Sequence, residues 1–164
     1  MIQTKRLTLR APRVDDLDAM FEVYSDPRAM KYWSTAPHAD RSVTSKLLEN
    51  RVAAWDAAPL NFQIELDDRY IGNAGNFMKD EIGFILHPDH WRNGYVSEAM
   101  AAIIPHLWQV TDHAQLTADA DPNNAASIGL LTSLGFSETH RAKNTFFFND
   151  QWYDSVYFAL PRPS

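Results

Sequence analysis

One segment, residues 81–100, constrains what this chain can fold into more than any other. It reads EIGFILHPDHWRNGYVSEAM, so that a short apolar strand runs into a turn containing Gly94 and then directly into a helix. The first N–H groups of a helix have no partner within the helix and carry the positive end of the helix dipole. A glycine in the turn lets the backbone approach a ligand closely. The amides of about residues 93–97 are therefore predicted to converge on an anion such as a phosphate.

The same segment is also compatible with an ordinary strand-to-helix connection, which is common in α/β proteins. It has neither the G-x-x-x-x-G-K-[ST] spacing of a Walker loop nor the G-x-G-x-x-G spacing of a dinucleotide-binding turn. Both familiar nucleotide motifs are therefore excluded. A regulator that binds ATP or a dinucleotide is consequently the weakest of the functional alternatives.

Composition and charge limit the class of protein further. The 164 residues suffice for a single domain, residues 1–164, around one core. A formal net charge of -6 disfavours nucleic acid and anionic membranes as partners and suits a cationic partner such as an amine. The absence of cysteine removes thiolate nucleophiles and cysteine metal sites. Because the N-terminus is a charged strand pattern and no apolar run is long enough to span a membrane, we expect a cytoplasmic enzyme or binding protein.

Apolar periodicity predicts strands and helices along the whole chain. Strands are expected around residues 7–9, 62–66, 70–77, 81–86, 115–120, 136–148 and 152–160, and helices around residues 15–24, 42–55, 96–110 and 124–134. Two strand-helix-strand crossovers require some parallel pairing, whereas the hairpins require antiparallel pairing. The predicted class is therefore α/β (α+β), with a mixed central sheet of about seven strands and flanking helices.

Two of the predicted helices carry more detailed expectations. On residues 42–55 one apolar stripe is predicted to face the core, formed by Val43, Leu47, Leu48, Val52 and Trp55. The helix at residues 124–134 is expected to end at Gly135, which can adopt the left-handed conformation of a helix C-terminus. Within that helix Ser127 lies on the inward-facing stripe, and on its own this favours a buried hydroxyl that bonds back to the preceding turn.

Four segments together resemble the GNAT superfamily of acyl-CoA-dependent N-acetyltransferases, specifically its RimJ/RimL-type branch. They are TKRLTLRAPRVDD, EIGFILHPDHWRNGYVSEAM, NAASIGLLTSLGF and WYDSVYFAL, which occur in the same order and at similar spacing over essentially the whole chain. The resemblance implies a GNAT-like fold and acetyl-CoA as the cofactor. It also implies an enzyme that acetylates a primary amine, either a protein N-terminus or a small-molecule amine.

The resemblance further implies where coenzyme A binds. The family pattern Gln/Arg-x-x-Gly-x-Gly/Ala, whose backbone amides hold the pyrophosphate, falls on residues 91–96, where Gly94 matches and Trp91 and Val96 differ. The strand that precedes the loop would bind the pantetheine arm through its backbone. The implied cofactor-binding residues are Phe84, Ile85, Leu86, Trp91, Arg92, Asn93, Gly94, Tyr95, Val96, Ser97, Asn124 and Ser127.

Acetyl transfer to an amine needs groups that manage protons. A lysine-like amine has an ordinary pKa of roughly 10.4 and an N-terminal amine one of roughly 8, so the amine must first lose a proton. The resemblance places the base at Glu81, which alternation puts on the face opposite Ile82; a solvated carboxylate is the alternative. Leu131 occupies the position where many family members have a tyrosine acid. Ser127 is then the catalytic acid by resemblance, with Tyr157 and solvent as alternatives.

Several residues near these motifs have less specific interpretations. Tyr32, Trp33 and Trp152 lie in loops that border the acceptor groove in this branch, although packing is the commoner role of a large aromatic residue. Glu98 lies in the first turn of the phosphate-loop helix, where it would oppose a bound phosphate, and we expect it to be structural. His87 and His90 have no evident third ligand, so no metal site is predicted.

The leading functional hypothesis is an acetyl-CoA-dependent N-acetyltransferase. Transfer is expected to be direct, in a ternary complex, because no cysteine is present to carry an acyl-enzyme. A non-catalytic CoA-binding sensor or interaction module is the alternative, since the tyrosine acid is missing. Exposed aromatic residues near the last strand are also compatible with a homodimer.

Overall fold

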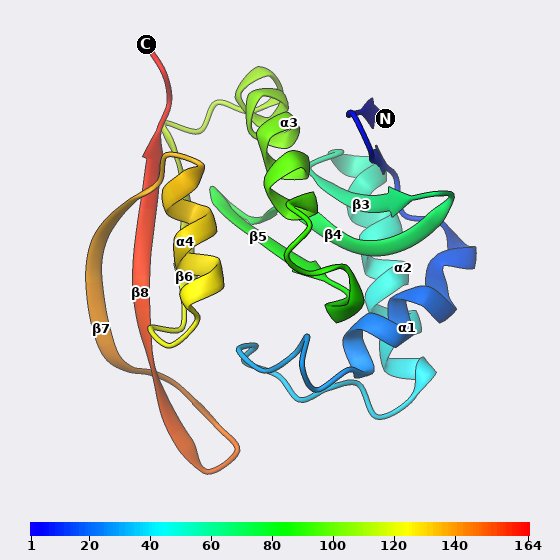
Figure 1. Cartoon of the computed structure of the whole chain (residues 1–164), viewed down its shortest axis with the longest axis horizontal. Helices are drawn as coiled ribbons and strands as arrows, with labels where there is room; N and C mark the ends of the chain where they lie inside the picture. Colours follow the sequence, from blue (N-terminus) through cyan, green and yellow to red (C-terminus); the bar gives the residue numbers. More distant parts are fainter.

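The structure is a computed structural model that describes all 164 residues. It is built on one eight-stranded sheet with the strand order β1-β2-β3-β4-β5-β6-β8-β7 (Figure 1). The strands are β1 (Ile2–Gln3), β2 (Thr8–Arg10), β3 (Asn61–Leu66), β4 (Arg69–Met78), β5 (Glu81–Leu86), β6 (Gln115–Ala120), β7 (Ser137–Phe148) and β8 (Gln151–Pro161). The predicted class is confirmed, and the short β1 brings the strand number to one more than expected.

The helices flank this sheet and agree with the predicted periodicity. They are α1 (Leu17–Ser25), α2 (Arg41–Ala57), α3 (Tyr95–Val110) and α4 (Ala125–Ser133), with short 3-10 turns η1 (Val14–Asp16) and η2 (Pro88–His90). The N–H groups of Gly135 and Phe136 donate to the carbonyls of Thr132 and Leu131, both at 3.0 Å, and Gly135 has φ 92°. This arrangement confirms the predicted helix end. None of the helices combines the length and the apolarity that a membrane crossing requires.

The sheet opens between β5 and β6. These two strands are parallel and pair at one register position, Glu81 with Thr117. Beyond it, β5 continues to pair with β4 as far as Leu86, and β6 continues to pair with β8 as far as Ala120. Figure 1 shows the two strands diverging from this point. One edge of β5 is therefore left without a strand partner, and its backbone groups are available to a ligand.

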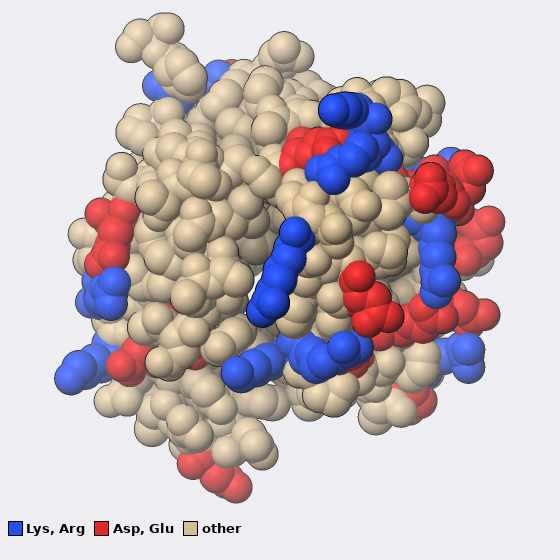
Figure 2. All heavy atoms as spheres, in the orientation of Figure 1, with Lys and Arg blue, Asp and Glu red and all other residues tan.

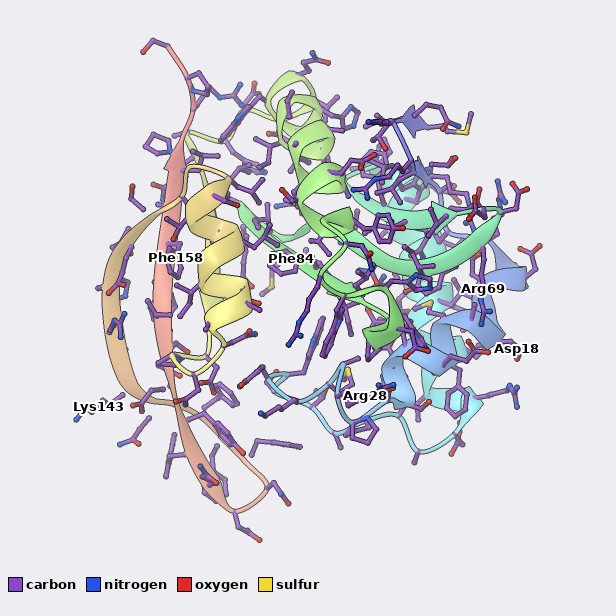
Figure 3. All side chains as sticks on the ribbon, viewed as in Figure 1. Asp18, Arg28, Arg69, Phe84, Lys143 and Phe158 are labelled. Carbon is purple, nitrogen blue, oxygen red and sulfur yellow. The ribbon has the colours of Figure 1, made fainter.

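Two hydrophobic clusters lie on opposite faces of the sheet. The larger one contains Ile82 and Leu86 of β5 and is covered by α3 and α4, whereas the smaller one contains Ile85 and is covered by α1 and α2. Figure 3 shows Phe84 and Phe158 on the side of α3 and α4, with the charged side chain of Lys143 pointing outward. This alternation along β5 confirms that Glu81 lies on the face opposite Ile82.

The prediction for α2 was wrong in one respect. Val43 was placed on the buried stripe, but 45% of its surface is exposed, whereas Thr44 is fully buried. Thr44 and Leu48 are one turn apart and are the two buried residues of the helix, so its buried stripe is rotated from the predicted one. The buried hydroxyl of Thr44 is satisfied by Nδ1 of His38 at 2.8 Å. Apolar periodicity misjudged the helix because this polar residue is buried with a hydrogen-bond partner in the loop that leads into α2.

Candidate active site

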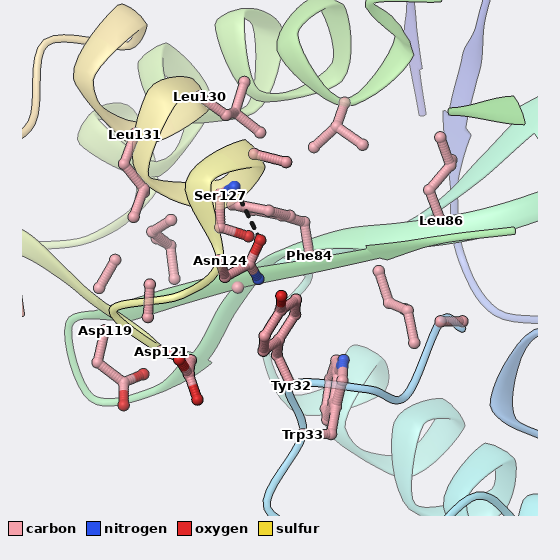
Figure 4. Close-up of a pocket in the computed structure, with 18 of the residues that line it drawn as sticks. Tyr32, Trp33, Phe84, Leu86, Asp119, Asp121, Asn124, Ser127, Leu130 and Leu131 are labelled. Atoms are coloured by element: carbon pink, nitrogen blue, oxygen red, sulfur yellow. Dashed lines mark hydrogen bonds between the residues drawn. The ribbon is translucent and has the colours of Figure 1, made fainter. Parts of the chain in front are cut away.

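A cavity of about 1110 Å³ occupies the opening between β5 and β6. Its walls come from β5, the N-terminus of α3, β6, α4, the loop between α1 and α2, and the β7–β8 hairpin. Figure 4 shows part of this lining, with Phe84 and Leu86 on β5 and Ser127 and Leu131 on α4. The cavity brings together all the residues predicted to bind the cofactor or the acceptor or to catalyse transfer, except two.

Asn93 and Trp152 are the two predicted site residues that do not line the cavity. The side-chain amide of Asn93 folds back on its own loop and donates to the carbonyls of His90 at 3.2 Å and Trp91 at 3.0 Å. Trp152 is the second residue of β8, is 54% exposed, and packs against Phe147 with ring centroids 5.4 Å apart. The possible use of these two exposed aromatic side chains in a homodimer stays a prediction.

The turn before α3 has a backbone conformation that suits glycine. Gly94 is the N-cap residue of α3 and has φ 76°, and Arg92 is also left-handed, with φ 62°. The first backbone hydrogen bond of the helix runs from Glu98 N–H to the Gly94 carbonyl at 2.9 Å. The amides of Tyr95 and Val96 therefore have no partner within the helix, and both residues line the cavity. This end of the cavity is suited to an anion.

Two hydrogen bonds fix the neighbouring walls. The indole N–H of Trp91 donates to the Leu86 carbonyl at 2.9 Å, which ties the loop to the end of β5. At the start of α4 the side-chain oxygen of Asn124 accepts from the backbone N–H of Ser127 at 3.2 Å, as a helix N-cap does. The Ser127 hydroxyl itself has no hydrogen-bond partner in the protein. The expectation that it bonds back to the preceding turn was wrong, and the half-buried hydroxyl lines the cavity instead.

Glu81 lies at the closed end of the opening and is half-buried. Burial raises the pKa of Glu81, and the negative charges of Asp119 and Asp80 raise it further. Asp119 is open to the cavity, and desolvation by the surrounding protein raises its pKa as well. Figure 4 shows Asp119 projecting from β6 on the side away from Leu131. A carboxylate whose pKa is raised is a better proton acceptor at near-neutral pH than an ordinary one.

Asp119 was not predicted as a site residue from the sequence. The signal was present in β6, where Leu116, Ala118 and Ala120 are buried and therefore place Asp119 on the opposite face. Thr117 shares that face and pairs with Glu81. The alternation alone predicts the face of Asp119, but its approach to Glu81 depends on the pairing of two strands that α3 separates in the sequence.

The loop between α1 and α2 closes one side of the cavity. The Tyr32 hydroxyl reaches across to donate to the Asn123 carbonyl at 3.2 Å. Trp33 packs edge-on against Tyr24 and Phe77, with ring centroids 6.0 and 6.4 Å apart. Figure 4 shows both Tyr32 and Trp33 beside the β5 wall. These contacts give this side of the cavity two aromatic walls.

Basic side chains also border the cavity. Arg28 and Lys31 of the α1–α2 loop and Arg92 of the turn before α3 belong to its lining. Figure 2 shows several Lys and Arg side chains near the middle of the face on which Arg28 lies. Arg28 is already paired with Asp26 at 2.6 Å, so Lys31 and Arg92 are the cations that favour an anionic ligand at the cavity entrance.

The fold and the site define an α/β protein in which one cavity joins a helix end suited to an anion and carboxylates of raised pKa. Residues 6–137 match the family model described as an acetyltransferase (GNAT) domain. The chain therefore belongs to the GNAT family of acetyltransferases, and it is an N-acetyltransferase.

Individual relatives agree with this assignment. Over 146 residues the chain is 30% identical to the uncharacterized N-acetyltransferase p20 of Bacillus licheniformis, which covers 84% of this chain and 82% of that protein. A GNAT-family acetyltransferase structure from Bacillus anthracis has a TM-score of 0.87 and 23% identity, covering 98% of this chain and 97% of that one. RimL, a ribosomal L7/L12 alpha-N-protein acetyltransferase solved with coenzyme A, has a TM-score of 0.83 and 16% identity, covering 96% of this chain and 95% of that one. These two structures share the fold with this chain, and the family model confirms the predicted resemblance to the GNAT superfamily.

Proposed function

We propose that residues 1–164 act as one acetyl-CoA-dependent N-acetyltransferase domain that moves the acetyl group directly to a primary amine in a ternary complex. The observation that carries this proposal is the single cavity that joins the free amides at the N-terminus of α3 to the carboxylate of Glu81. The chain has no cysteine to carry an acyl-enzyme. The presence of coenzyme A in the RimL structure supports the choice of acyl donor.

The residues around Gly94 fit the diphosphate of coenzyme A. Gly94 adopts a left-handed conformation that side chains disfavour, and the amides that follow it are free. Arg92 lines the cavity without an ion-pair partner, so its guanidinium can add a charge-assisted contact. The free edge of β5 at Phe84, Ile85 and Leu86 would hold the pantetheine arm, with Asn124 and Ser127 on the facing wall. Acetyl-CoA supplies an acyl group activated as a thioester.

Proton management falls to residues at the opposite end of the cavity. Glu81 is proposed to take the proton from the incoming ammonium group, because its raised pKa improves it as a base. Ser127 is proposed as the proton donor to the leaving sulfur, because its hydroxyl has no protein partner and lines the cavity. Tyr157 also lines the cavity, directly across from Asp119 in the β6–β8 pairing, and is the alternative donor.

The acceptor is proposed to enter beside Tyr32 and Trp33. These residues line the cavity on the face of β5 to which Glu81 belongs. Trp152 lies farther out on the β7–β8 hairpin, where a longer acceptor such as a peptide N-terminus would reach it. A small-molecule amine would contact only the inner aromatic walls. The two acceptor classes therefore differ in whether they use the hairpin.

A direct assay tests the proposed function. Purified protein and acetyl-CoA are mixed with a panel of peptides, polyamines and amino acids, and free thiol release and the acetylated product are measured. Acceptor-dependent release together with an acetylated amine supports the proposal. Coenzyme A binding without release for any acceptor would instead favour a non-catalytic sensor. The observation that favours this second function is Leu131, which is buried at the position of the tyrosine acid and has no proton to donate.

A further inference from the structure

Arg6, which lies just before β2, is bound to the outer side of the Gly94 turn. Its Nη1 donates to the carbonyl of Asn93 at 2.9 Å, and its Nε donates to Oε2 of Glu98 at 2.7 Å. The guanidinium carbon lies 4.5 Å from the centre of the Tyr95 ring. One side chain thus contacts the residues on both sides of Gly94 and the first turn of α3, although 87 positions separate Arg6 from Asn93.

Glu98 completes this connection between the N-terminal segment and α3. Its Oε1 accepts hydrogen bonds from the hydroxyl of Thr4 at 2.6 Å and from the backbone N–H of Arg6 at 2.8 Å. Partial burial acts to raise the pKa of Glu98, but the hydrogen bonds from Thr4 and Arg6 outweigh it and lower the pKa. Glu98 therefore has a structural role, as expected, in which it binds Thr4 and Arg6, and its carboxylate stays charged.

We propose that Arg6 is a positioning residue that aims the Gly94 amide at the diphosphate of coenzyme A. In a trans peptide the carbonyl and the following N–H lie in one plane and point in opposite directions. The chain has no cis peptide, so binding the Asn93 carbonyl to Arg6 turns the Gly94 N–H away from Arg6. Gly94 lines the cavity, whereas Arg6 and Asn93 do not. Arg6, which lies outside the cavity, therefore holds the Gly94 N–H toward the cavity.

The turn needs such an external contact because of its backbone conformation. Arg92 and Gly94 both have left-handed φ values, 62° and 76°, within three residues. A residue other than glycine in this conformation is disfavoured and persists only where the surroundings hold it. The bond from Arg6 to the carbonyl of Asn93, between these two residues, is the side-chain contact that enters the turn from another part of the chain.

Arg6 also removes an electrostatic conflict. Glu98 lies in the first helical turn, where an unpaired carboxylate would repel a diphosphate bound at the same helix end. The ion pair with Arg6 neutralises that charge while the bond to Asn93 fixes the turn. Loss of Arg6 would therefore weaken diphosphate binding in two ways, without removing any group that lines the cavity.

This inference rests on the proposed function, because it concerns how the same site binds coenzyme A. The test is calorimetry with two ligands, coenzyme A and pantetheine, which lacks the diphosphate and is titrated into the millimolar range. Arg6→Gln is expected to weaken coenzyme A binding about tenfold, as the loss of charge-assisted hydrogen bonds predicts, and to leave pantetheine binding unchanged. Arg6→Lys keeps the charge but cannot bind Glu98 and Asn93 with one planar group, and it is expected to restore part of the loss.

Arg41 provides a matched control on another surface. Its Nε donates to Asp18 at 2.7 Å and its guanidinium lies 5.5 Å from the Phe21 ring, so it makes the same kinds of contact away from the cavity. Arg41→Gln is expected to bind both ligands like the wild type.

Equal weakening of both ligands by Arg6→Gln, or no weakening of either, would overturn the positioning role. Failure of the wild type to bind coenzyme A would overturn the proposed function instead. If Arg6→Gln does not fold, unchanged coenzyme A affinity in Arg6→Lys decides against the inference.

Discussion

Glu81 and Thr117 are the one register pair that joins β5 to β6, and this pair marks the closed end of the opening in the sheet. The two strands are hydrogen-bonded at this point, because the N–H of Thr117 donates to the carbonyl of Asp80 at 2.8 Å. Asp119 lies two positions farther along β6, where the strands have separated. The candidate base is therefore fixed at the paired end, while its neighbouring carboxylate faces the space that a ligand would fill.

The pH dependence of turnover tests the role of Glu81. Burial raises its pKa, with Asp119 and Asp80 raising it further, so the carboxylate becomes an active base as pH rises through this elevated value. Glu81→Gln is expected to lower kcat about 10²-fold between that pKa and the pKa of the amine. The loss should shrink at higher pH, where the amine is already neutral. The measurement is kcat against pH at saturating substrates, and an unaltered acidic limb would remove Glu81 from the mechanism.

The same substitution is expected to affect stability in the opposite direction. The pKa of Glu81 is higher in the folded protein than its ordinary value, so folding favours the neutral form. The stabilising contribution is present below the ordinary pKa and is lost as pH rises through the folded pKa. Glu81→Gln should therefore raise the Tm at pH 7 relative to wild type, and the difference should disappear at acidic pH. Thermal unfolding across this range checks the sign; a lower Tm at pH 7 would contradict it.

A pair of glycine substitutions separates the Gly94 turn from general helix stability. Gly94 has φ 76°, and Gly94→Ala is expected to cost about 1 kcal/mol of unfolding free energy and to weaken coenzyme A binding. Gly129 lies inside α4, and a methyl group there would meet no atom within 4 Å. Gly129→Ala should stabilise the protein by about 0.5–1 kcal/mol without changing coenzyme A affinity. Urea unfolding and calorimetry measure both effects, and undiminished affinity in Gly94→Ala would argue against the amide site.

The sequence predicted those parts of the molecule that depend on neighbouring residues. The turn at Gly94, the helix end at Gly135 and the alternation along β5 each follow from a few adjacent positions. The insertion of β8 between β6 and β7 was not predicted, since hydrophobic pattern defines the faces of a strand and not its neighbours. The contact between Arg6 and Asn93 was missed for the same reason. These contacts join segments that local periodicity cannot relate.

The segment TKRLTLRAPRVDD, residues 4–16, resembles the GNAT family and contains a buried ion-pair network around Arg10. This network leads to a prediction about stability. Arg10 is 4% exposed and bridges two buried carboxylates, with its Nη2 2.6 Å from Asp16 Oδ1 and its Nε bonded to Glu65. Removing one partner of a buried ion pair leaves uncompensated charge inside the protein. Arg10→Met is therefore expected to lower the unfolding free energy by about 3–5 kcal/mol.

Arg13 is the control for this prediction, because it reaches the same carboxylate from the surface. Its Nη1 lies 3.4 Å from Oε2 of Glu65, but its side chain is 54% exposed. An exposed ion pair contributes about 0–1 kcal/mol, so Arg13→Met should change the unfolding free energy far less than Arg10→Met. Urea unfolding followed by tryptophan fluorescence gives both values. Equal losses of unfolding free energy in the two variants would contradict the prediction. They would show that the burial of Arg10 does not make its loss more costly than that of Arg13.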